Sequence, residues 1–465
     1  MKDLSKAAPI RVGEKVQIRI ENYGHEGEGV GRCRNFTVFV PEALKGELVL
    51  VNITEVRKNF GRGIVMKILE PSPERIVPLC SSAAFCGGCQ LQHLNYENQL
   101  ALKHQRVIDA VERIGGLKDV AIDPVIGMAE PWHYRNKAQY PLGISNDAVV
   151  MGFYRKGTHQ IVPLDGCLLQ SEGSNTIADK VRQLVEIYRV PIYNELNHSG
   201  LLRHVLIKQG SQTGEVMVVF ITRNQPFPAG EKIAGELVGI FPEIKSVAHN
   251  VNDARGNVIL GPSTKIIWGQ DTITEHIGDF KFKIAAESFF QVNPLQTEKL
   301  YRKAVEFAGL TGRETVLDAY CGVGSLTLFL AEQAQKVYGI EFVTQAVKNA
   351  LDNTVLNGIK NVEFIVGATE KVLPQLTREG ITFQVAVVDP PRSGCEEEVL
   401  KSFAENQVSR IVYVSCNPST LARDLKILEG LGYKTLEIQP VDMFPHTYHV
   451  ECVARIERKI NSLQE

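Results

Sequence analysis

The amino-acid sequence predicts an α/β protein with three regions: a small N-terminal β-barrel, a mixed α+β middle region and a C-terminal parallel sheet covered by helices. Two observations carry this prediction. From Leu300 onward, near-continuous apolar strands alternate with helical stretches, which is the pattern of a parallel sheet buried on both faces. Before about residue 70, short strands are separated by glycine-rich turns, which is typical of a small barrel.

The composition limits the class of protein. The chain has 465 residues, 44% of them hydrophobic and 22% charged, which corresponds to about three folded domains and excludes a disordered or fibrous chain. No stretch reaches the roughly 18 apolar residues of a membrane-spanning helix, and the first residues lack the apolar core of a signal peptide. We therefore expect a cytoplasmic protein without membrane contact.

Nine cysteines and a formal net charge of -2 narrow the class further. An odd number of cysteines in a long chain without an export signal favours free thiols over a disulfide framework. The near balance of charges argues against a protein that coats nucleic acid by bulk charge, but it permits local basic patches.

The N-terminal region, residues 11–69, contains four strand-like segments, KVQIRIEN, TVFVP, GELVLVNIT and GIVMKIL, with a glycine-rich turn at 24–29. Regularly spaced short strands predict a barrel of OB type. Its last part, 56–69, combines basic residues with an aromatic and has no acid: Arg57, Lys58, Phe60, Arg62 and Lys67. This combination suits single-stranded RNA, and a strand edge kept soluble by its charges would explain it equally well.

Pro71-Ser72-Pro73 marks the boundary to a middle region that extends to about Ile284. This region mixes strand-like segments (VLIKQ, EVMVVFIT and SVAHNV) with a helical segment at 99–114. Basic and aromatic residues recur between positions 132 and 159, which makes this stretch a second candidate RNA surface. Its members are Arg135, Lys137, Tyr140, Phe153, Tyr154, Arg155 and Lys156.

Three cysteines fall within ten residues of the middle region: Cys80, Cys86 and Cys89. A Cys-x-x-Cys pair with a third cysteine nearby places three soft ligands within reach of one metal centre, and Cys167 is the natural candidate for a fourth. Four thiolates can hold zinc or an iron–sulfur cluster, and the spacing does not distinguish the two. The alternative is that these are separate buried thiols. This interpretation is the weaker one, because three cysteines lie so close together in the sequence.

In the C-terminal region, a strand ending in Asp318 runs into a tight turn with Gly322 and Gly324 and then into a helix. This arrangement lets the backbone approach a nucleotide-like cofactor. Thr327 replaces the third glycine of dinucleotide-binding turns, and the Asp318 carboxylate would repel a pyrophosphate, so an NAD site is disfavoured. An acid before the turn instead suits the cationic amino-acid end of S-adenosylmethionine. Glu341, 17 residues beyond Gly324, can accept both ribose hydroxyls.

Two further strands end in polar residues, Asp389 in DPPRSG and Cys416 in YVSCNP. Together with Asp318 and Glu341 they occupy the carboxyl ends of predicted parallel strands. Those ends form one edge of an open sheet, where ligands bind. The sequence therefore predicts that these four side chains converge, whereas a packing explanation would treat each as an unrelated strand-end residue.

Cys416 also precedes a helix that we expect to begin at Ser419 or Thr420. Because a helix N-terminus stabilises negative charge, the thiol would be shifted toward the nucleophilic thiolate. A structural cysteine at the end of an apolar strand is the competing interpretation.

Five segments closely resemble the RNA (uracil-5-)-methyltransferases, the family that includes the bacterial 23S rRNA and tRNA 5-methyluridine enzymes. They are SFFQVNP (288–294), DAYCGVGSLTL (318–328), DPPRSG (389–394), YVSCNPSTLARDL (413–425) and DMFPHTYHVE (442–451). The resemblance implies three domains: an OB-like TRAM barrel that binds RNA (9–69), a central α+β iron–sulfur domain (70–284) and a Rossmann-like S-adenosylmethionine-dependent methyltransferase domain (285–465). It also implies that a helix at about 92–123 packs on the catalytic domain.

The resemblance assigns roles to individual residues. It implies Cys416 as the nucleophile that attacks carbon 6 of uracil, and Glu451 as the base that removes the carbon-5 proton. If the last strand runs antiparallel, Glu451 at its start shares the ligand edge with Cys416. The family's cofactor-contacting positions match Gln291, Tyr320, Glu341 and Asp389. The ligands of a 4Fe-4S cluster, with zinc as the alternative metal, match Cys80, Cys86, Cys89 and Cys167.

The TRAM-like and cysteine-rich regions favour the 23S rRNA branch of the family, since the shorter tRNA enzyme lacks both. We therefore expect a monomeric 23S rRNA methyltransferase that forms 5-methyluridine. Two alternatives stay open. One is the same chemistry on a tRNA uridine, and the other is a non-catalytic RNA-binding protein that retains the methyltransferase scaffold.

Overall fold

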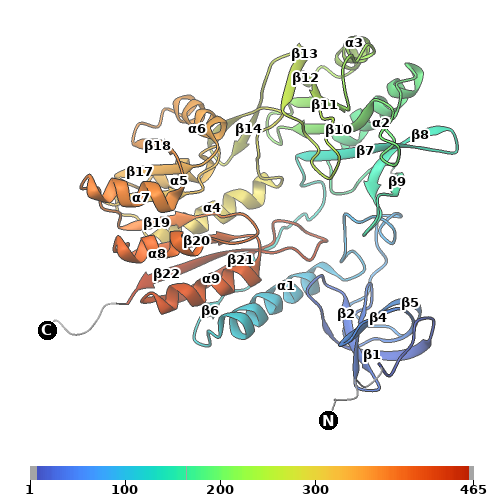
Figure 1. The fold of residues 1–465 in the computed structure, drawn as a ribbon, viewed down its shortest axis with the longest axis horizontal. Coiled ribbons are helices and arrows are strands. Elements are labelled where there is room, and N and C mark those ends of the chain that lie inside the picture. Colours follow the sequence, from blue (N-terminus) through green and yellow to red (C-terminus); the bar gives the residue numbers. More distant parts are fainter. Residues whose placement is uncertain (1–7, 164, 460–465) are drawn as a thin grey trace.

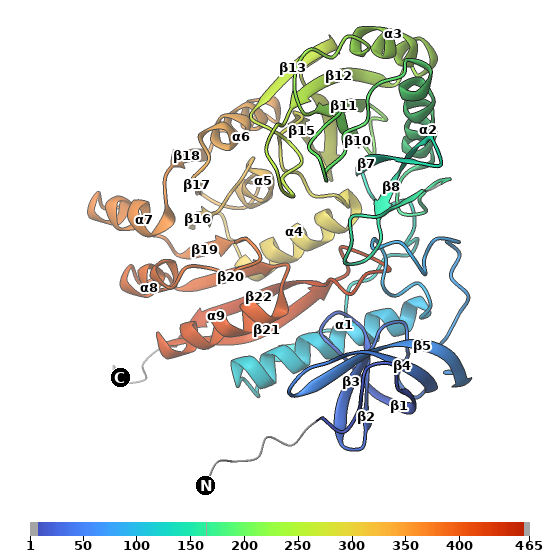
Figure 2. The ribbon, with the colours of Figure 1, turned by 45° about the vertical axis from the view of Figure 1, so that its right-hand side comes forward.

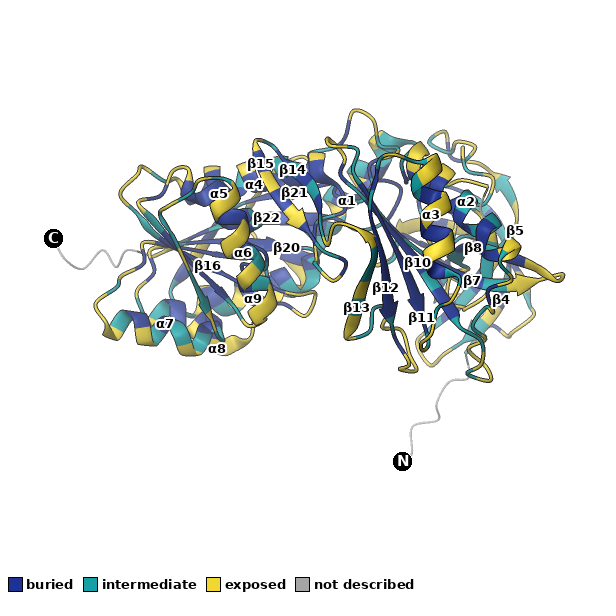
Figure 3. Cartoon of the chain, turned by 90° about the horizontal axis from the view of Figure 1, so that it is seen from above, coloured by how far each residue is buried: buried dark blue, intermediate teal, exposed yellow. Residues whose placement is uncertain are grey.

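The computed structural model describes residues 8–163 and 165–459. Figure 1 shows a small barrel, a central sheet and a larger C-terminal sheet. Burial follows these layers, because the strands of the two larger sheets are mostly buried whereas the helices turn exposed faces outward (Figure 3). The predicted fold class is confirmed.

The N-terminal barrel closes in the strand order β1-β2-β3-β5-β4. Its strands are β1 Lys15–Tyr23, β2 Gly29–Cys33, β3 Phe36–Val40, β4 Leu48–Val56 and β5 Phe60–Glu70. Alternate side chains of β1, Val16, Ile18 and Ile20, are buried inside the barrel. The sequence predicted four of these strands and missed β2. At Gly31 of β2 a Cβ would come within 2.3 Å of the Arg19 carbonyl oxygen, so the position requires glycine. Because glycine has no apolar side chain, the alternating pattern of a strand is weak in this segment.

The central sheet has seven strands in the order β13-β12-β11-β10-β7-β8-β9. They are β7 Lys137–Ser145, β8 Ala148–Tyr154, β9 Ile161–Pro163, β10 Leu202–Gln209, β11 Val216–Thr222, β12 Ile244–Val251 and β13 Ser263–Gly269. Helices α2 (Glu172–Ile187) and α3 (Gly230–Ile240) share the apolar core on one face. A hairpin of β14 (Ile273–Ile277) and β15 (Phe280–Ile284) leads to the C-terminal sheet.

The C-terminal sheet has eight strands in the order β18-β17-β16-β19-β20-β22-β21-β6. Seven of them come from the last part of the chain: β16 Thr315–Ala319, β17 Lys336–Glu341, β18 Val362–Val366, β19 Val385–Val388, β20 Arg410–Ser415, β21 Tyr433–Val441 and β22 Glu451–Arg458. Strands β16 to β20 pair in parallel, and β22 runs antiparallel to both β20 and β21. The predicted alternation of strands and helices is confirmed.

Helices cover both faces of this sheet. One face carries α4 Pro294–Ala308 and α5 Ser325–Ala331, and the other carries α7 Thr369–Arg378, α8 Glu397–Glu405 and α9 Pro418–Gly430. Helix α6 (Thr344–Leu356) packs on β17, β18 and the hairpin strand β15. No helix in the described parts of the chain combines the length and the apolar character needed to cross a bilayer.

A segment next to the cysteine-rich loop completes the C-terminal sheet. Helix α1 (Tyr96–Ala110) continues through a π-helical turn (Val111–Gly115) into β6 (Ala121–Ile122), which pairs in parallel with β21. The helix lies between the barrel and α9 in Figures 1 and 2. Val107 of α1 shares a buried core with Leu421 of α9. The helix predicted at 99–114 corresponds to α1 and the π-helical turn, whereas the helix expected at about 92–123 is shorter because residues 121–122 form β6. Helix α1 packs on the C-terminal sheet.

Candidate active site

Four strand-end residues lie at one edge of the C-terminal sheet. Strand β16 pairs with β17 on one side and with β19 on the other, so the strand order reverses there. Connections that leave in opposite directions open a crevice at such a switch point, outside the carboxyl ends of the strands. Asp318, Glu341, Asp389 and Cys416 lie in or just after the last residues of β16, β17, β19 and β20. The structure thus brings them to the same edge.

The turn after β16 contains three residues in the left-handed region: Tyr320 (φ 65°), Gly322 (φ 56°) and Gly324 (φ 78°). A Cβ on Gly322 would meet no atom within 4 Å, so the backbone there faces open space. A Cβ on Gly324 would lie 3.0 Å from the ring of Phe364, so this glycine permits close packing under the turn. Both features suit a turn that lets a ligand approach the backbone.

The carboxylate of Glu341 is held beside this turn. The backbone amide of Gly322 donates to its Oε2 at 3.1 Å, and the amide of Val343 donates to its Oε1 at 2.8 Å. The next residues, Phe342 and Val343, are apolar and exposed. A fixed carboxylate beside an exposed apolar surface suits the ribose and the base of a nucleoside.

Two buried carboxyl groups at this edge of the sheet hold their protons more tightly than in water. Asp318 is 1% exposed and accepts a hydrogen bond from Thr327 Oγ1 at 2.5 Å. Burial, and then the charges of Asp389 and Glu341, raise the pKa of Asp318 to about 7. Burial likewise raises the pKa of Asp389 to about 7. Because a cationic ligand would stabilise the charged carboxylates, the crevice suits a ligand with positive charge.

Tyr301 of α4 lies near these acids, and the sequence did not single it out. Its hydroxyl is hydrogen-bonded to Ser325 Oγ at 2.9 Å. Burial, and then the charge of Asp389, raise the pKa of Tyr301. In the sequence, Tyr301 is one of many apolar positions on the buried face of α4, so no signal separates it from the packing residues.

Cys416 and Glu451 lie on neighbouring strands. Strand β20 ends at Ser415, β22 begins at Glu451, and the antiparallel register pairs Ser415 with Cys452. The last strand does run antiparallel, which was the condition for Glu451 to share an edge of the sheet with Cys416. Glu451 is 4% exposed, and burial raises its pKa to about 8. A carboxyl group that titrates near neutral pH suits proton transfer.

The expectation that the helix N-terminus shifts Cys416 toward the thiolate is wrong for the protein alone. Burial raises the pKa of the Cys416 thiol, and the carboxyl groups of Glu451 and Asp389 raise it further, whereas Arg392 opposes them. Desolvation and two neighbouring acids outweigh the opposing effect of the Arg392 guanidinium. Arg392 was not singled out from the sequence, although it lies in the DPPRSG segment.

The predicted start of α9 is also wrong, since Asn417 rather than Ser419 or Thr420 caps the helix. Its Oδ1 accepts a hydrogen bond from the Ser419 amide at 3.1 Å, and Pro418 takes the first helical position. Its Nδ2 donates to the carbonyl of Arg392 at 3.3 Å. The cap therefore ties the loop that carries Arg392 to the residue that follows Cys416.

The predicted cofactor residues Gln291 and Tyr320 lie on different sides of the sheet. Asn136 Nδ2 donates to the Gln291 carbonyl at 3.1 Å, so the central region helps to fix the loop before α4. Lys208 of β10 supports the same loop, because its Nζ donates to the carbonyl of Ser288 at 2.9 Å. Tyr320 instead packs against the core beneath α7 and α8.

The four candidate ligand cysteines line one cavity of about 300 Å³. Cys80, Cys86 and Cys89 come from the loop before α1, and Cys167 comes from the segment after β9. Among the residues that the structure describes, no three cysteine, histidine or acidic side chains are grouped so that they could hold a metal ion. The thiols share a cavity without converging on a single-ion position.

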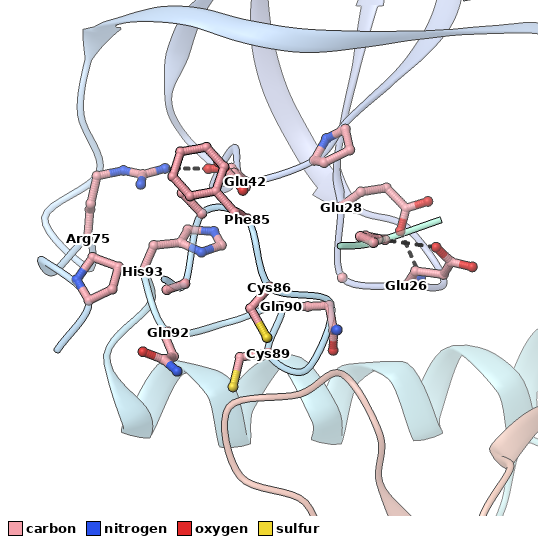
Figure 4. Close-up of a pocket in the computed structure, with 16 residues that line it drawn as sticks. Glu26, Glu28, Glu42, Arg75, Phe85, Cys86, Cys89, Gln90, Gln92 and His93 are labelled. Atoms are coloured by element: carbon pink, nitrogen blue, oxygen red, sulfur yellow. Dashed lines mark hydrogen bonds and ion pairs between the residues drawn. The ribbon is translucent and has the colours of Figure 1, made fainter. Parts of the chain in front are cut away.

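Cys86 and Cys89 also line a second cavity, of about 270 Å³, between the cysteine loop and the barrel (Figure 4). Glu26 and Glu28 of the barrel line its other side. Burial raises the pKa of the Cys86 thiol, and it raises the pKa of Cys89 to about 12. Metal binding at these positions would therefore release protons as the thiolates form.

Of the two candidate RNA surfaces, the central one is only partly available. On the barrel, the guanidinium of Arg62 lies 5.7 Å from the ring centroid of Phe39 and 5.8 Å from that of Phe60. In the central region, Tyr140 is 3% exposed and packs on Phe153 at 5.2 Å between ring centroids. The inclusion of Tyr140 in an RNA surface is wrong, because its side chain points into the core of the central sheet.

Glu451→Gln should make the free energy of unfolding depend less on pH. The folded pKa of Glu451 is about 8, against about 4.3 in an unfolded chain. The folded state thus keeps a proton that the unfolded state loses, so this group stabilises the fold fully below about pH 4.3 and loses that contribution as pH rises to about 8. Denaturant titrations at about pH 5 and about pH 8.5 measure the difference. The exposed Glu429→Gln is the control, and equal pH slopes for wild-type and Glu451→Gln would contradict the prediction.

Comparisons with known proteins identify the family of the chain. A family profile for tRNA (uracil-5-)-methyltransferases matches residues 254–459, and a TRAM domain profile matches residues 9–66. An uncharacterized RNA methyltransferase of Bacillus cereus is 49% identical over 96% of this chain and 97% of its own length. Another, from Caldanaerobacter subterraneus, is 48% identical over 97% of this chain and 99% of its own length.

The chain is also similar to a solved structure, the Pyrococcus abyssi tRNA (uracil-54, C5)-methyltransferase in complex with S-adenosyl-L-homocysteine. The TM-score is 0.76 at 29% identity, over 95% of this chain and 99% of that protein. The shared fold, the acidic side chains at the carboxyl ends of the strands and the identity to relatives along nearly the full length lead to one conclusion. This chain is an RNA methyltransferase that uses S-adenosylmethionine, and it belongs to the RNA (uracil-5-)-methyltransferase family.

Proposed function

We propose that this enzyme methylates carbon 5 of a specific uridine in 23S rRNA, and that Cys416 and Glu451 carry out the reaction. The antiparallel register of β20 and β22 is the observation that carries the proposal. It brings a thiol and a buried carboxyl group to the same edge of the sheet as the strand-end acids. Methyl transfer to a ring carbon needs both a nucleophile and a base at one place.

The order of bond changes follows from the chemistry of uracil. Carbon 5 is a poor nucleophile until the Cys416 thiolate attacks carbon 6, which forms a C–S bond and moves the electron pair of the double bond toward carbon 5 as an enolate. S-adenosylmethionine, when bound, supplies an electrophilic methyl group to that carbon. The Glu451 carboxylate then removes the carbon-5 proton, the ring double bond re-forms and the thiolate leaves. One proton is released for each methyl group transferred.

Nearby residues prepare the site for these steps. The guanidinium of Arg392 lowers the pKa values of both Cys416 and Glu451, so we assign it to stabilising the thiolate and the carboxylate. The target base must leave its stacked position to reach the crevice. We assign the cofactor contacts to Gln291, Asp318, Tyr320, Gly322, Gly324, Glu341 and Asp389.

We further propose that Cys80, Cys86, Cys89 and Cys167 hold a 4Fe-4S cluster. The four thiols line one cavity of about 300 Å³, which supports a common metal centre. Zinc needs four ligands at about 2.3 Å from one ion, and the described residues do not offer such a point. A cluster bound by these four thiolates would cross-link the loop before α1 to the segment after β9, and zinc stays the alternative occupant.

We propose 23S rRNA because the TRAM-like and cysteine-rich regions resemble the rRNA branch of the family, and we place the three regions at residues 9–69, 70–284 and 285–465; the organisation alone does not exclude tRNA. The Pyrococcus abyssi enzyme, which acts on a tRNA uracil, matches this chain over 99% of its own length. A tRNA enzyme can therefore share nearly the whole organisation, and tRNA is the second candidate substrate. A non-catalytic RNA-binding role is disfavoured because the thiol and the buried carboxyl group are both in place.

Labelled S-adenosylmethionine should transfer its methyl group to 23S rRNA rather than to tRNA. Both RNAs are taken from cells that lack the enzyme, so that the target uridine is unmodified. We expect label in 23S rRNA as 5-methyluridine, and no label with Cys416→Ala. Label confined to tRNA would contradict the rRNA proposal and leave the chemistry intact, whereas no label in either RNA would contradict both.

Glu451→Gln should accumulate a covalent protein–RNA adduct, because the adduct forms but its proton is not removed. The adduct is measured as a slowly migrating band on a denaturing gel with the unmodified RNA and S-adenosylmethionine. The double variant Glu451→Gln/Cys416→Ala should abolish the band. A band that survives without Cys416 would exclude this residue as the nucleophile.

Protein purified without oxygen should contain iron and sulfide, about four of each per chain, and absorb broadly in the visible range. Cys89→Ser should lower the iron content strongly, since it removes one ligand. Cys33→Ser, in the barrel, is the matched control and should leave the iron content unchanged. Stoichiometric zinc without visible absorption would overturn the cluster in favour of a zinc site.

A further inference from the structure

The loop between β21 and β22, residues 442–450, leads directly into Glu451. Its two ends are neighbours, because Val441 pairs with Glu451 in the sheet. The loop is buried in the molecule: Asp442 and Met443 have no exposed surface, and His446 is 4% exposed. Whatever fixes this loop therefore also fixes the start of β22 and the carboxyl group of Glu451.

Helix α1 holds the first half of the loop through a buried ion pair. Lys103 Nζ lies 2.5 Å from Asp442 Oδ1, and both side chains are fully buried. Lys103 also donates to the Phe444 carbonyl at 3.0 Å, and the Tyr96 hydroxyl donates to Asp442 Oδ2 at 2.8 Å. A buried ion pair contributes little net stability, but either charge alone would be costly to bury, so the pair strongly favours one arrangement of the loop.

His446 is the second point of attachment. The Gln99 side chain of α1 contacts it twice: Oε1 accepts from the His446 amide at 3.0 Å, and Nε2 lies 3.3 Å from Nδ1. The His446 carbonyl accepts hydrogen bonds from the amides of Gln90 and Leu91, both at 3.0 Å. Its ring stacks on Trp132, with 3.7 Å between the ring centroids.

The same contacts connect the loop to the cysteine region. Gln90 directly follows Cys89, and Figure 4 shows the C-terminal segment passing next to Cys89. Trp132, which stacks on His446, also packs in a small apolar cluster with Cys89 and Cys167. The 442–450 loop is thus held from α1 and from the cysteine region at once.

We propose that Lys103 and Gln99 are positioning residues for the proton-removal step: they fix the 442–450 loop, and the loop fixes the Glu451 carboxyl group. This inference rests on the proposed role of Glu451 as the base. Proton transfer requires the base within about 3 Å of the reacting atom, so a small displacement of the loop slows this step strongly. Attack by Cys416 and methyl transfer use residues outside the loop and precede proton removal.

RNA that contains 5-fluorouridine separates the two halves of the reaction. Fluorine replaces the carbon-5 hydrogen, so Glu451 has no proton to remove and the bond between Cys416 and carbon 6 persists. We choose two variants of the full chain: Lys103→Met/Asp442→Asn, which removes both buried charges together, and Gln99→Leu, which keeps them. Each should turn over ordinary unmodified RNA at least ~10-fold more slowly. Each should form the 5-fluorouridine adduct within about twofold of the wild-type rate, a selectivity that a general loss of structure would not produce.

Arg113→Met is the matched control, because Arg113 lies on the π-helical turn that extends α1 and its side chain is 75% exposed. Neither assay should change in this variant. Glu451→Gln is the reference and should show the same selective loss as the two test variants. If Lys103→Met/Asp442→Asn misfolds and loses both turnover and adduct formation, a selective loss of turnover in Gln99→Leu still supports the proposal.

The outcomes separate this inference from the function on which it rests. Normal turnover of ordinary RNA by Glu451→Gln would overturn the role of Glu451 and the positioning role with it. Slow turnover by Glu451→Gln with normal turnover by both test variants would overturn only the positioning role. A parallel loss of turnover and of adduct in both test variants would also overturn it, since the residues would then act on the structure as a whole.

Discussion

The reversal of one strand, β22, is the constraint on which the catalytic arrangement depends. In a fully parallel sheet, the start of one strand and the end of the next lie at opposite edges, roughly 20 Å apart for a six-residue strand. Because β22 runs antiparallel between β20 and β21, its first residue, Glu451, comes to the edge where β20 delivers Cys416. The connection from β21 must then turn back at that same edge, so residues 442–450 form a loop there and not a helix on one face of the sheet.

Burial, and not the overall charge, sets the electrostatics of this edge. The formal net charge of the chain is only -2, yet Asp318, Asp389 and Glu451 lie where desolvation raises their pKa values to about 7 or 8. The same acids raise the pKa of the Cys416 thiol. Positive charge brought into the crevice would favour the ionised forms of the acids and of the thiol together. Under the proposed mechanism, a bound cationic cofactor would therefore offset the charges of the acids that raise the pKa of the proposed nucleophile.

The sequence predicted those features of the structure that depend on residues close together in the chain. Alternation of apolar strands and helices predicted the C-terminal sheet, and strand-end polarity predicted which side chains share its edge. The pattern failed at β2, where Gly31 gives no apolar signal, and at the start of α9, where Asn417 is a better-placed cap than Ser419 or Thr420. The pKa of Cys416 was predicted in the wrong direction, because the helix dipole is visible in the sequence whereas the packing of Glu451 and Asp389 around the thiol is not.

Helix α1 shows why the sequence did not predict the residues that hold the 442–450 loop. Lys103 and Gln99 contact residues more than 300 positions later in the chain, and a lysine or glutamine on a helix usually signals a solvated face. The pairing of β6 with β21, together with the core that Val107 shares with Leu421, brings α1 against the C-terminal sheet. In that position the side chain of Lys103 is buried, and a buried charge needs an opposite charge beside it. The carboxylate of Asp442 supplies that charge. The segment that follows the cysteine loop thus supports the 442–450 loop that leads into Glu451, so the cysteine region and the C-terminal sheet must fold against each other.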